Sequence, residues 1–315
     1  MSKLAFVFPG QGSQKIGMLA DLADQFSSVK ETFNEASEVL DYDMWKLLQE
    51  GTQEEINLTE RTQPILLTSS VAIWRVWTDR AGKVPSYMAG HSLGEWSALV
   101  CAQAVDFADA LKIVRARGQY MQQAVPLGEG AMAAIIGLDD KTIVQACATA
   151  AESGVVDAVN FNAPGQVVIA GSTTAVNDAI ELCKQAGAKR ALPLPVSAPF
   201  HTSLMGPAAE QLSELVHSVT FKQPTIPIVH NVHAQIEDNV EKIRDLMLEQ
   251  IYRPVRWVDC IKQLKMNGVT TTVECGPGRV LSGLSKRIDS ELVSLITEDP
   301  ASFEKTLSHF GTFGS

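Results

Sequence analysis

The sequence predicts an α/β fold with a mostly parallel sheet. Apolar runs of strand length alternate with longer segments of helical periodicity through most of the chain, a pattern typical of parallel strands joined by helices. Between residues 128 and 197 shorter elements follow in the order β-α-β-β-α-β, which is the ferredoxin-like arrangement. We therefore expect a large subdomain of residues 1–127 and 198–315, and a small ferredoxin-like subdomain of residues 128–197 inserted into it.

The first elements are assigned from apolar runs and helix-start signals. Residues 3–8 predict a buried strand, and the helix over residues 27–40 is expected to open at a capping box from Ser28 to Glu31. The next helix, over residues 62–82, has Pro64 in its first helical position and Gly82 as its stop. A strand over residues 86–90 follows, and then two helices that continue to about Val125.

The remaining elements divide between the inserted subdomain and the completion of the large sheet. Within the insertion we expect strands at 131–137, 155–162, 166–171 and 188–196, with helices at 139–153 and 174–187. Residues 226–232 and 270–276 then predict strands of the large sheet. The tail after Pro300 is weakly patterned and is expected to be mobile.

Composition and charge exclude several classes of function. The 315 residues carry a net charge of -10 and a pI of about 5.1, which argues against a broad surface for nucleic acid or anionic membrane. The first apolar run is too short for a signal peptide, and none approaches the roughly 20 residues of a membrane span. Five scattered cysteines without a C-x-x-C pair favour free thiols and a cytoplasmic location.

The segment GHSLG, centred on Ser92, matches the G-x-S-x-G pattern of a nucleophile elbow. An apolar run precedes it and a helical run follows, which is the context that the motif requires. The free N–H groups at the start of such a helix can stabilise a developing oxyanion. The alternative is a tight structural turn in which Ser92 only caps the helix.

A serine nucleophile needs a base, and His201 is our candidate among six histidines. It lies in a proline-bounded loop where the inserted subdomain ends, although it could equally be a residue that starts the next helix. His230 and His233 lie three apart in a strand-like run, so they would face opposite ways and make a poor metal pair. The others adjoin the serine, lie on a solvated helix face or belong to the tail: His91, His217 and His309.

Arg117 lies in the middle of the apolar stripe of its predicted helix, whereas Arg115 projects to the opposite side. A buried guanidinium needs an anion, which could be an internal Asp or Glu, or the carboxylate of a substrate. The loop after the first strand begins a G-x-G pattern at Gly10 but fails both nucleotide fingerprints. Its Gln11 could still offer a side-chain N–H to an oxyanion.

Six segments in order, FVFPGQGSQ, TQPILL, AGHSLGEWSAL, PVSAPFH, RPVRW and ECGPGRVLSGL, resemble the malonyl-CoA:acyl carrier protein transacylases of bacterial fatty-acid synthesis. The resemblance covers residues 3–297. It implies an α/β-hydrolase-like core and a ping-pong transfer in which Ser92 takes malonyl from malonyl-CoA. The phosphopantetheine thiol of acyl carrier protein then accepts it. No metal or redox cofactor is implied, because coenzyme A enters as part of the substrate.

The resemblance also implies a role for each matching residue. His201 would be the base, oriented by a backbone carbonyl of Gln250 rather than by an acid. Leu93 N–H and Gln11 would form the oxyanion hole, and Arg117 would hold the malonyl carboxylate. The remaining substrate-binding candidates are the residue next to the nucleophile and two from the small subdomain: His91, Asn160 and Asn162.

Two residues near the predicted site and one basic surface patch are the last features that we consider. Trp96 stands where family members often have tyrosine, and Phe200 precedes the histidine at a position where the family varies. We expect both to lie close enough to the site to shape the acyl pocket. The acidic carrier protein would dock on a local basic patch, for which the candidates are Lys189, Arg190, Arg279, Lys286 and Arg287. The alternatives are a serine esterase or thioesterase, which would pass the acyl group to water, and a non-catalytic scaffold.

Overall fold

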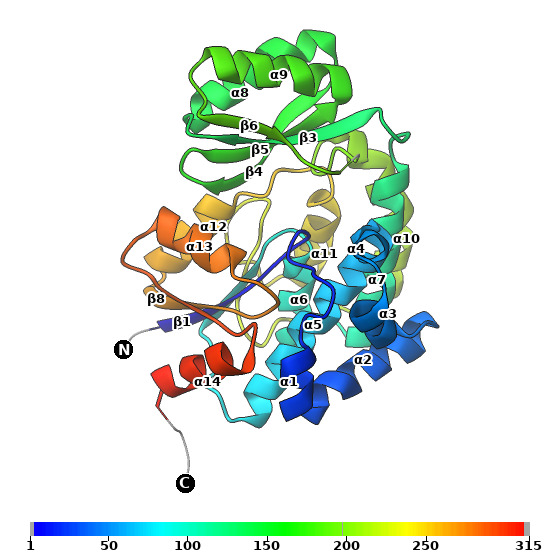
Figure 1. Cartoon of the computed structure of the whole chain (residues 1–315), viewed down its shortest axis with the longest axis vertical. Helices are drawn as coiled ribbons and strands as arrows, with labels where there is room; N and C mark the ends of the chain where they lie inside the picture. The colour runs from blue at the N-terminus through cyan, green and yellow to red at the C-terminus, as the bar shows by residue number, and fades with distance from the viewer. Residues whose placement is uncertain (1–2, 197, 312–315) are drawn as a thin grey trace.

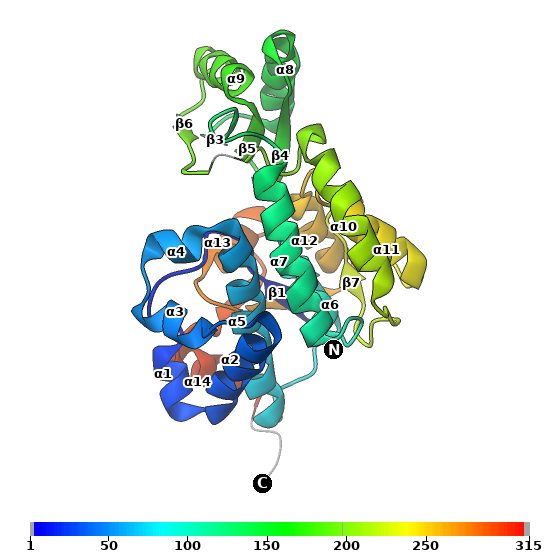
Figure 2. The same ribbon diagram turned by 90° about the vertical axis from the view of Figure 1, so that its right-hand side faces the viewer.

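The structure, a computed structural model, describes residues 3–196 and 198–311. A large α/β unit lies below a smaller one in Figure 1, and Figure 2 shows the same two parts from the side. The predicted fold class is confirmed. A five-stranded parallel sheet forms the centre of the large unit, and a four-stranded antiparallel sheet forms the small subdomain.

The large sheet has the strand order β7-β2-β1-β8-β9. Its strands are Ile228–Val229 (β7), Tyr87–Gly90 (β2), Lys3–Phe8 (β1), Val269–Glu274 (β8) and Val293–Ile296 (β9). Alternate side chains of β1 enter two different cores, because Phe6 and Phe8 pack on one face of the sheet and Ala5 and Val7 on the other. Phe8 pairs with Gly90 at the carboxyl ends of β1 and β2. The loops after these strands, which carry Gln11 and Ser92, therefore lie side by side at the edge where α/β sites form.

Helices cover both faces of this sheet. In the described part of the chain, the core on the Phe6 face contains residues of ten helices, some of which pack on other helices rather than on the sheet: α1 (Ala20–Gln25), α2 (Ser27–Leu40), α3 (Met44–Glu50), α4 (Gln53–Asn57), α5 (Thr59–Asp79), α6 (Gly94–Cys101), α7 (Phe107–Gln123), α10 (Gly206–Ser218), α11 (Val240–Glu249) and α14 (Pro300–His309). On the Ala5 face the helices are α12 (Trp257–Met266) and α13 (Val280–Ile288). A single 3₁₀ turn, Ser203–Met205, precedes α10.

The small subdomain has the ferredoxin-like strand order β4-β5-β3-β6. Its elements are β3 (Gly130–Ile136), α8 (Asp140–Ala150) with a 3₁₀ turn at Ala151–Ser153, β4 (Val156–Ala163), β5 (Gln166–Ser172), α9 (Thr173–Gln185) and β6 (Arg190–Pro193). Ile135 and Ile169 pack into a separate core with α8 and α9, whereas Met132 and Val168 face the large unit. The subdomain boundaries at residues 128 and 197 remain a prediction, and Ser197 lies outside the described residues.

Two helix starts differ from the predictions. Helix α2 begins at Ser27 after an extended Phe26, with no side-chain cap, so the capping box at Ser28 does not form. Phe26 packs against Phe303, with 5.6 Å between ring centroids, and this contact sets the entry of the chain. Pro64 lies inside α5 rather than in its first position, because the carbonyl of Leu58 already accepts the first helical hydrogen bonds.

The tail after Pro300 is also corrected. Asp299 and Ser302 form a reciprocal capping box at the start of α14, and Pro300 occupies its first turn. Phe303 is fully buried, and its ring lies 5.9 Å from that of Trp77. A capped helix with a buried aromatic anchor is therefore part of the fold as far as residue 311. The last four residues, 312–315, lie outside the described chain.

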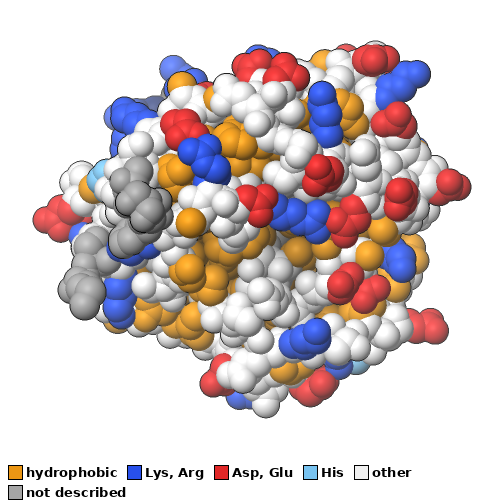
Figure 3. All heavy atoms as spheres, turned by 90° about the horizontal axis from the view of Figure 1, so that it is seen from below, with side chains coloured by type: hydrophobic (Ala, Val, Ile, Leu, Met, Phe, Trp, Pro, Cys, Tyr) orange, Lys and Arg blue, Asp and Glu red, His pale blue; other side chains and the backbone are white. Residues whose placement is uncertain are grey.

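Charged side chains of both signs are distributed over the face of the molecule that lies opposite the small subdomain (Figure 3). On the face opposite the small subdomain, acidic and basic side chains are interspersed among small apolar patches (Figure 3). Within residues 3–196 and 198–311, no helix combines the length and apolar character that crossing a membrane requires.

Candidate active site

Ser92 occupies a sharp strand-to-helix turn, as the motif predicts. Its φ of 50° lies in the left-handed region, which is rare for a residue with a side chain. A Cβ on Gly94 would lie 2.0 Å from the carbonyl oxygen of Phe8, so only glycine lets α6 start this close to β1. Asn231 holds the turn from below by accepting from Ser92 N–H at 2.8 Å and donating to the carbonyl of Gly90 at 2.7 Å.

His201 meets the serine, as predicted. Its Nε2 lies 2.8 Å from Ser92 Oγ, and its Nδ1 lies 2.7 Å from the backbone oxygen of Gln250. An Nδ1–H that donates to this carbonyl leaves Nε2 free to accept the serine proton. Burial, and then the charge of Arg117, lower the pKa of His201 to about 3, so the imidazole is neutral at physiological pH. The φ of His201 is 66°, which places a second strained residue at the site.

Arg117 lies at the base of the site and is 1% exposed. Its guanidinium donates to three oxygens of uncharged groups: Gln63 Oε1 at 2.8 Å, Gln250 Oε1 at 2.9 Å and Ser92 Oγ at 3.2 Å. Burial lowers the pKa of Arg117 to about 10, and the nearby charge of Glu95 opposes this shift. Within the described chain no Asp or Glu bonds to this guanidinium directly, so the first of the two alternatives, an internal ion pair, does not form there.

A cleft of about 420 Å³ separates the sheet edge from the small subdomain and contains this group of residues. All the other predicted site residues except Gln250 line the cleft, namely Gln11, His91, Leu93, Asn160 and Asn162. His91 Nε2 lies 2.8 Å from Asn162 Oδ1, which joins the two subdomains across the cleft. Met132 and Val168 form an apolar part of the wall that the small subdomain contributes, next to its two asparagines.

Of the two family departures, one shapes the cleft. Phe200 lines it beside His201. Trp96 is fully buried in α6 and packs against Phe221, with 6.2 Å between centroids, so the expectation that it shapes the acyl pocket is wrong. The residue follows the elbow in sequence, but the turn directs its side chain into the core behind the nucleophile.

A group of buried polar residues that was not among the predicted site residues lies beneath the elbow. Glu95 Oε1 accepts from His230 Nδ1 at 2.6 Å, and its Oε2 accepts from Gln250 Nε2 at 2.7 Å. The strand expected around the histidines ends at Val229, so the rings of His230 and His233 lie 6.1 Å apart rather than on opposite faces. The signal that could have identified the group is an acidic residue, Glu95, within an otherwise apolar helix.

Metal ligation finds no support among residues 3–196 and 198–311, because no three His, Cys, Asp or Glu side chains are grouped to hold an ion. The remaining histidines lie away from the cleft. His217 is exposed on α10, and His309 is in the last turn of α14.

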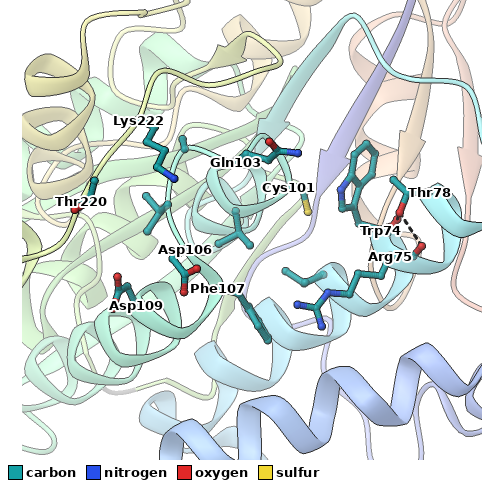
Figure 4. A pocket seen from close by; sticks show the side chains of 14 residues that line it. Trp74, Arg75, Thr78, Cys101, Gln103, Asp106, Phe107, Asp109, Thr220 and Lys222 are labelled. Atoms are coloured by element: carbon teal, nitrogen blue, oxygen red, sulfur yellow. Dashed lines mark hydrogen bonds between the residues drawn. The ribbon is translucent and has the colours of Figure 1, made fainter.

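A second hollow of about 530 Å³ lies between α5, α6 and α7 and lacks the chemistry of the cleft. Figure 4 shows Arg75, Asp106 and Cys101 around it. Arg75 already bonds to Glu35 at 2.6 Å, and Asp106 caps α7 by accepting from the N–H of Ala108. Burial raises the pKa of the Cys101 thiol. The set offers no activated nucleophile, since its thiol stays protonated.

Comparison with known proteins agrees with this chemistry. Residues 5–290 match the family model described as the acyl transferase domain. The malonyl CoA-acyl carrier protein transacylase of Escherichia coli K12 is 55% identical over 98% of this chain and 99% of its own length. The enzyme of the same name from Bacillus subtilis is 47% identical and covers 96% of each chain.

Solved structures agree as closely. An acyl carrier protein S-malonyltransferase from Vibrio cholerae has 56% identity, covers 96% of this chain and 99% of its own, and superposes with a TM-score of 0.95. A structure described as a type II PKS acyl-carrier protein in complex with its malonyl-transacylase matches with 53% identity, coverage of 98% and 100%, and a TM-score of 0.97. The chain therefore belongs to the acyl transferase domain family and, within it, to the malonyl CoA-acyl carrier protein transacylases.

Proposed function

We propose that this chain transfers the malonyl group of malonyl-CoA to the phosphopantetheine thiol of acyl carrier protein through a malonyl-Ser92 intermediate. One observation carries the mechanism: Ser92 Oγ is bonded at the same time to His201 Nε2 at 2.8 Å and to Arg117 at 3.2 Å. The first contact supplies a base for a nucleophile, and the second supplies a cation for a substrate carboxylate.

In the first half-reaction, Ser92 Oγ attacks the thioester carbonyl while His201 Nε2 takes its proton. The negative charge that develops on the carbonyl oxygen is stabilised by Leu93 N–H at the start of α6 and by the side chain of Gln11. When the tetrahedral intermediate collapses, the C–S bond breaks and the coenzyme A thiolate leaves with the proton held by His201. The products are malonyl-Ser92 and free coenzyme A.

In the second half-reaction the same groups act in reverse. His201 takes the proton of the carrier phosphopantetheine thiol, and the thiolate attacks the ester carbonyl of malonyl-Ser92. The ester C–O bond then breaks, and the proton returns from His201 to Ser92 Oγ. The apolar wall around Met132 and Val168 favours this thiol over water by limiting solvent in the cleft.

Arg117 is proposed to fix the orientation of the malonyl group. Its present partners are an alcohol and two amides, so the substrate carboxylate would be its first directly bonded anion. Such a two-pronged contact aligns the carbonyl at the other end of malonyl with Ser92. An esterase for neutral acyl chains would gain nothing from a buried arginine at this position.

Carrier docking is proposed at the basic residues beside the mouth of the cleft. Arg287 of α13 bonds to Gln166 Oε1, and Gln166 lines the cleft. Lys189 and Arg190 lie at the start of β6 on the small subdomain, whereas Arg279 already pairs with Glu298 at 3.3 Å. A cytoplasmic location is proposed as well, and the five buried, unpaired cysteines support it.

The test is the mass of the intact protein after brief mixing with malonyl-CoA. We expect one malonyl adduct that Ser92→Ala abolishes and that acyl carrier protein discharges faster than water does. An adduct that disappears at the same rate with or without carrier would instead identify a hydrolase. The absence of any adduct on the wild-type chain would favour the alternative of a non-catalytic scaffold.

A further inference from the structure

Glu95 is a buried carboxylate directly beneath the nucleophile, and the proposed reaction does not use it. It lies in the first turn of α6 and is 1% exposed. Three donors reach it: His230 Nδ1 at 2.6 Å, Gln250 Nε2 at 2.7 Å and the N–H of Asn231 at 3.2 Å. Burying a carboxylate is costly unless its oxygens are bonded, and here both oxygens are.

The contact with Glu95 and the burial of the other ring nitrogen define the tautomer of His230. His230 Nε2 is buried and has no hydrogen-bond partner among the described residues. A protonated His230 would therefore leave an N–H donor unpaired in the core, which favours the neutral tautomer with its proton on Nδ1. The buried cation linked to Glu95 is Arg117, one side chain away through Gln250.

Gln250 joins these two charges in a single orientation. Its Nε2 donates to Glu95 and to the backbone oxygen of Ser92, whereas its Oε1 accepts from Arg117. A carboxylate only accepts and a guanidinium only donates, so a flipped amide would oppose both neighbours. The same residue offers its backbone oxygen to His201 Nδ1 at 2.7 Å. One residue thus contacts the base, the substrate-binding cation and the nucleophile turn.

Given the acyl transfer proposed above, we propose that Glu95 is a positioning residue for it. Its carboxylate fixes the side chain of Gln250, so that the amide oxygen orients Arg117 and the backbone oxygen orients His201. Glu95 touches neither substrate nor reacting atoms, and its effect on the reaction passes through Gln250.

The variant Glu95→Gln preserves shape and removes the charge. An amide in this place cannot accept from His230 and from Gln250 while that histidine keeps its proton on Nδ1, so one buried bond is lost in either orientation. We expect kcat/KM for malonyl-CoA to fall at least about tenfold, as for residues of one hydrogen-bond network. The preference for malonyl-CoA over acetyl-CoA should fall as well, because acetyl carries no carboxylate for Arg117.

A double-mutant cycle with Gln250→Met separates this role from a general loss of packing. Methionine removes the amide but keeps the backbone oxygen and much of the volume, so the further effect of Glu95→Gln in that background should be less than about threefold. Ser97→Ala, at a buried position of the same helix, controls for disturbance of α6 and should behave as wild type. Urea unfolding verifies that each variant is folded.

Two results would overturn the inference: wild-type kinetics for Glu95→Gln, or an equal loss in both backgrounds of the cycle. If Glu95→Gln does not fold, the test rests on Gln250→Met alone. An unchanged preference for malonyl-CoA over acetyl-CoA in that variant would contradict the positioning role proposed for Glu95. The wild-type chain is measured alongside. Failure of the wild type to form a malonyl adduct would instead refute the proposed function itself.

Discussion

Replacing Arg117 by methionine should reduce malonyl transfer far more than acetyl transfer. The guanidinium is buried, and its partners Gln63, Gln250 and Ser92 are uncharged, so we propose that the malonyl carboxylate is its direct counter-ion. Loss of one partner of a buried, hydrogen-bonded charge pair costs about 2–5 kcal/mol. That free energy corresponds to a decrease in kcat/KM for malonyl-CoA of roughly 30-fold to a few thousand-fold.

The assay compares the initial rates of acyl-enzyme formation from malonyl-CoA and acetyl-CoA in the same preparation. The kcat/KM for acetyl-CoA should fall less than about threefold, because acetyl has no carboxylate. Arg115→Met is the matched control, since Arg115 lies on the same helix and bonds instead to the carbonyl of Leu40 at 3.0 Å. Equal losses for both substrates would refute the reasoning, because they would mean that Arg117 supports the site without reading the carboxylate.

Two further predictions concern pH and docking. Burial keeps the folded-state pKa of His201 near 3, below its ordinary value of 6.5, so protonation favours the unfolded chain. The free energy of unfolding should therefore be highest above pH 6.5 and fall as the pH drops toward 3, and His201→Gln should weaken this dependence in urea titrations at several pH values. Arg287→Glu should raise KM for carrier protein several-fold without changing malonyl-CoA kinetics. The control is Lys305→Glu, which alters an exposed charge on α14 and should change neither quantity. Equal effects of the two variants would show that Arg287 is not part of the docking surface.

The fold and the reactive residues could be predicted because their signals are local. The β-α-β-β-α-β order follows from periodicity, the serine turn from five consecutive residues, and the burial of Arg117 from one helical face. The starts of α2 and α5 could not be predicted from local signals. Phe26 sets the start of α2 by packing against Phe303, and Leu58 precedes α5 without a side-chain cap. Tertiary contact overrides the local signal there.

The partners of the site were harder to predict because they are distant in sequence. Glu95 and Gln250 are separated by 155 positions, and Glu95 and His230 by 135. Residue types in a single chain do not indicate which of many buried polar groups will meet. The carbonyl of Gln250 could be expected only from the family resemblance, because every residue has a carbonyl and only the fold selects which one reaches His201.

The electrostatics of the cleft couple substrate binding to the strength of the base. After burial, the charge of Arg117 is the next cause that lowers the pKa of His201, and a lowered pKa makes the imidazole a weaker acceptor for the serine proton. A malonyl carboxylate bonded to Arg117 offsets that charge, and the pKa of His201 should then rise toward the range in which a base is effective. On this proposal, Ser92 should be activated most when the substrate bears a carboxylate that binds Arg117. Selectivity for malonyl then arises in the rate of attack as well as in binding, which is why the Arg117→Met comparison is made on kcat/KM rather than on affinity.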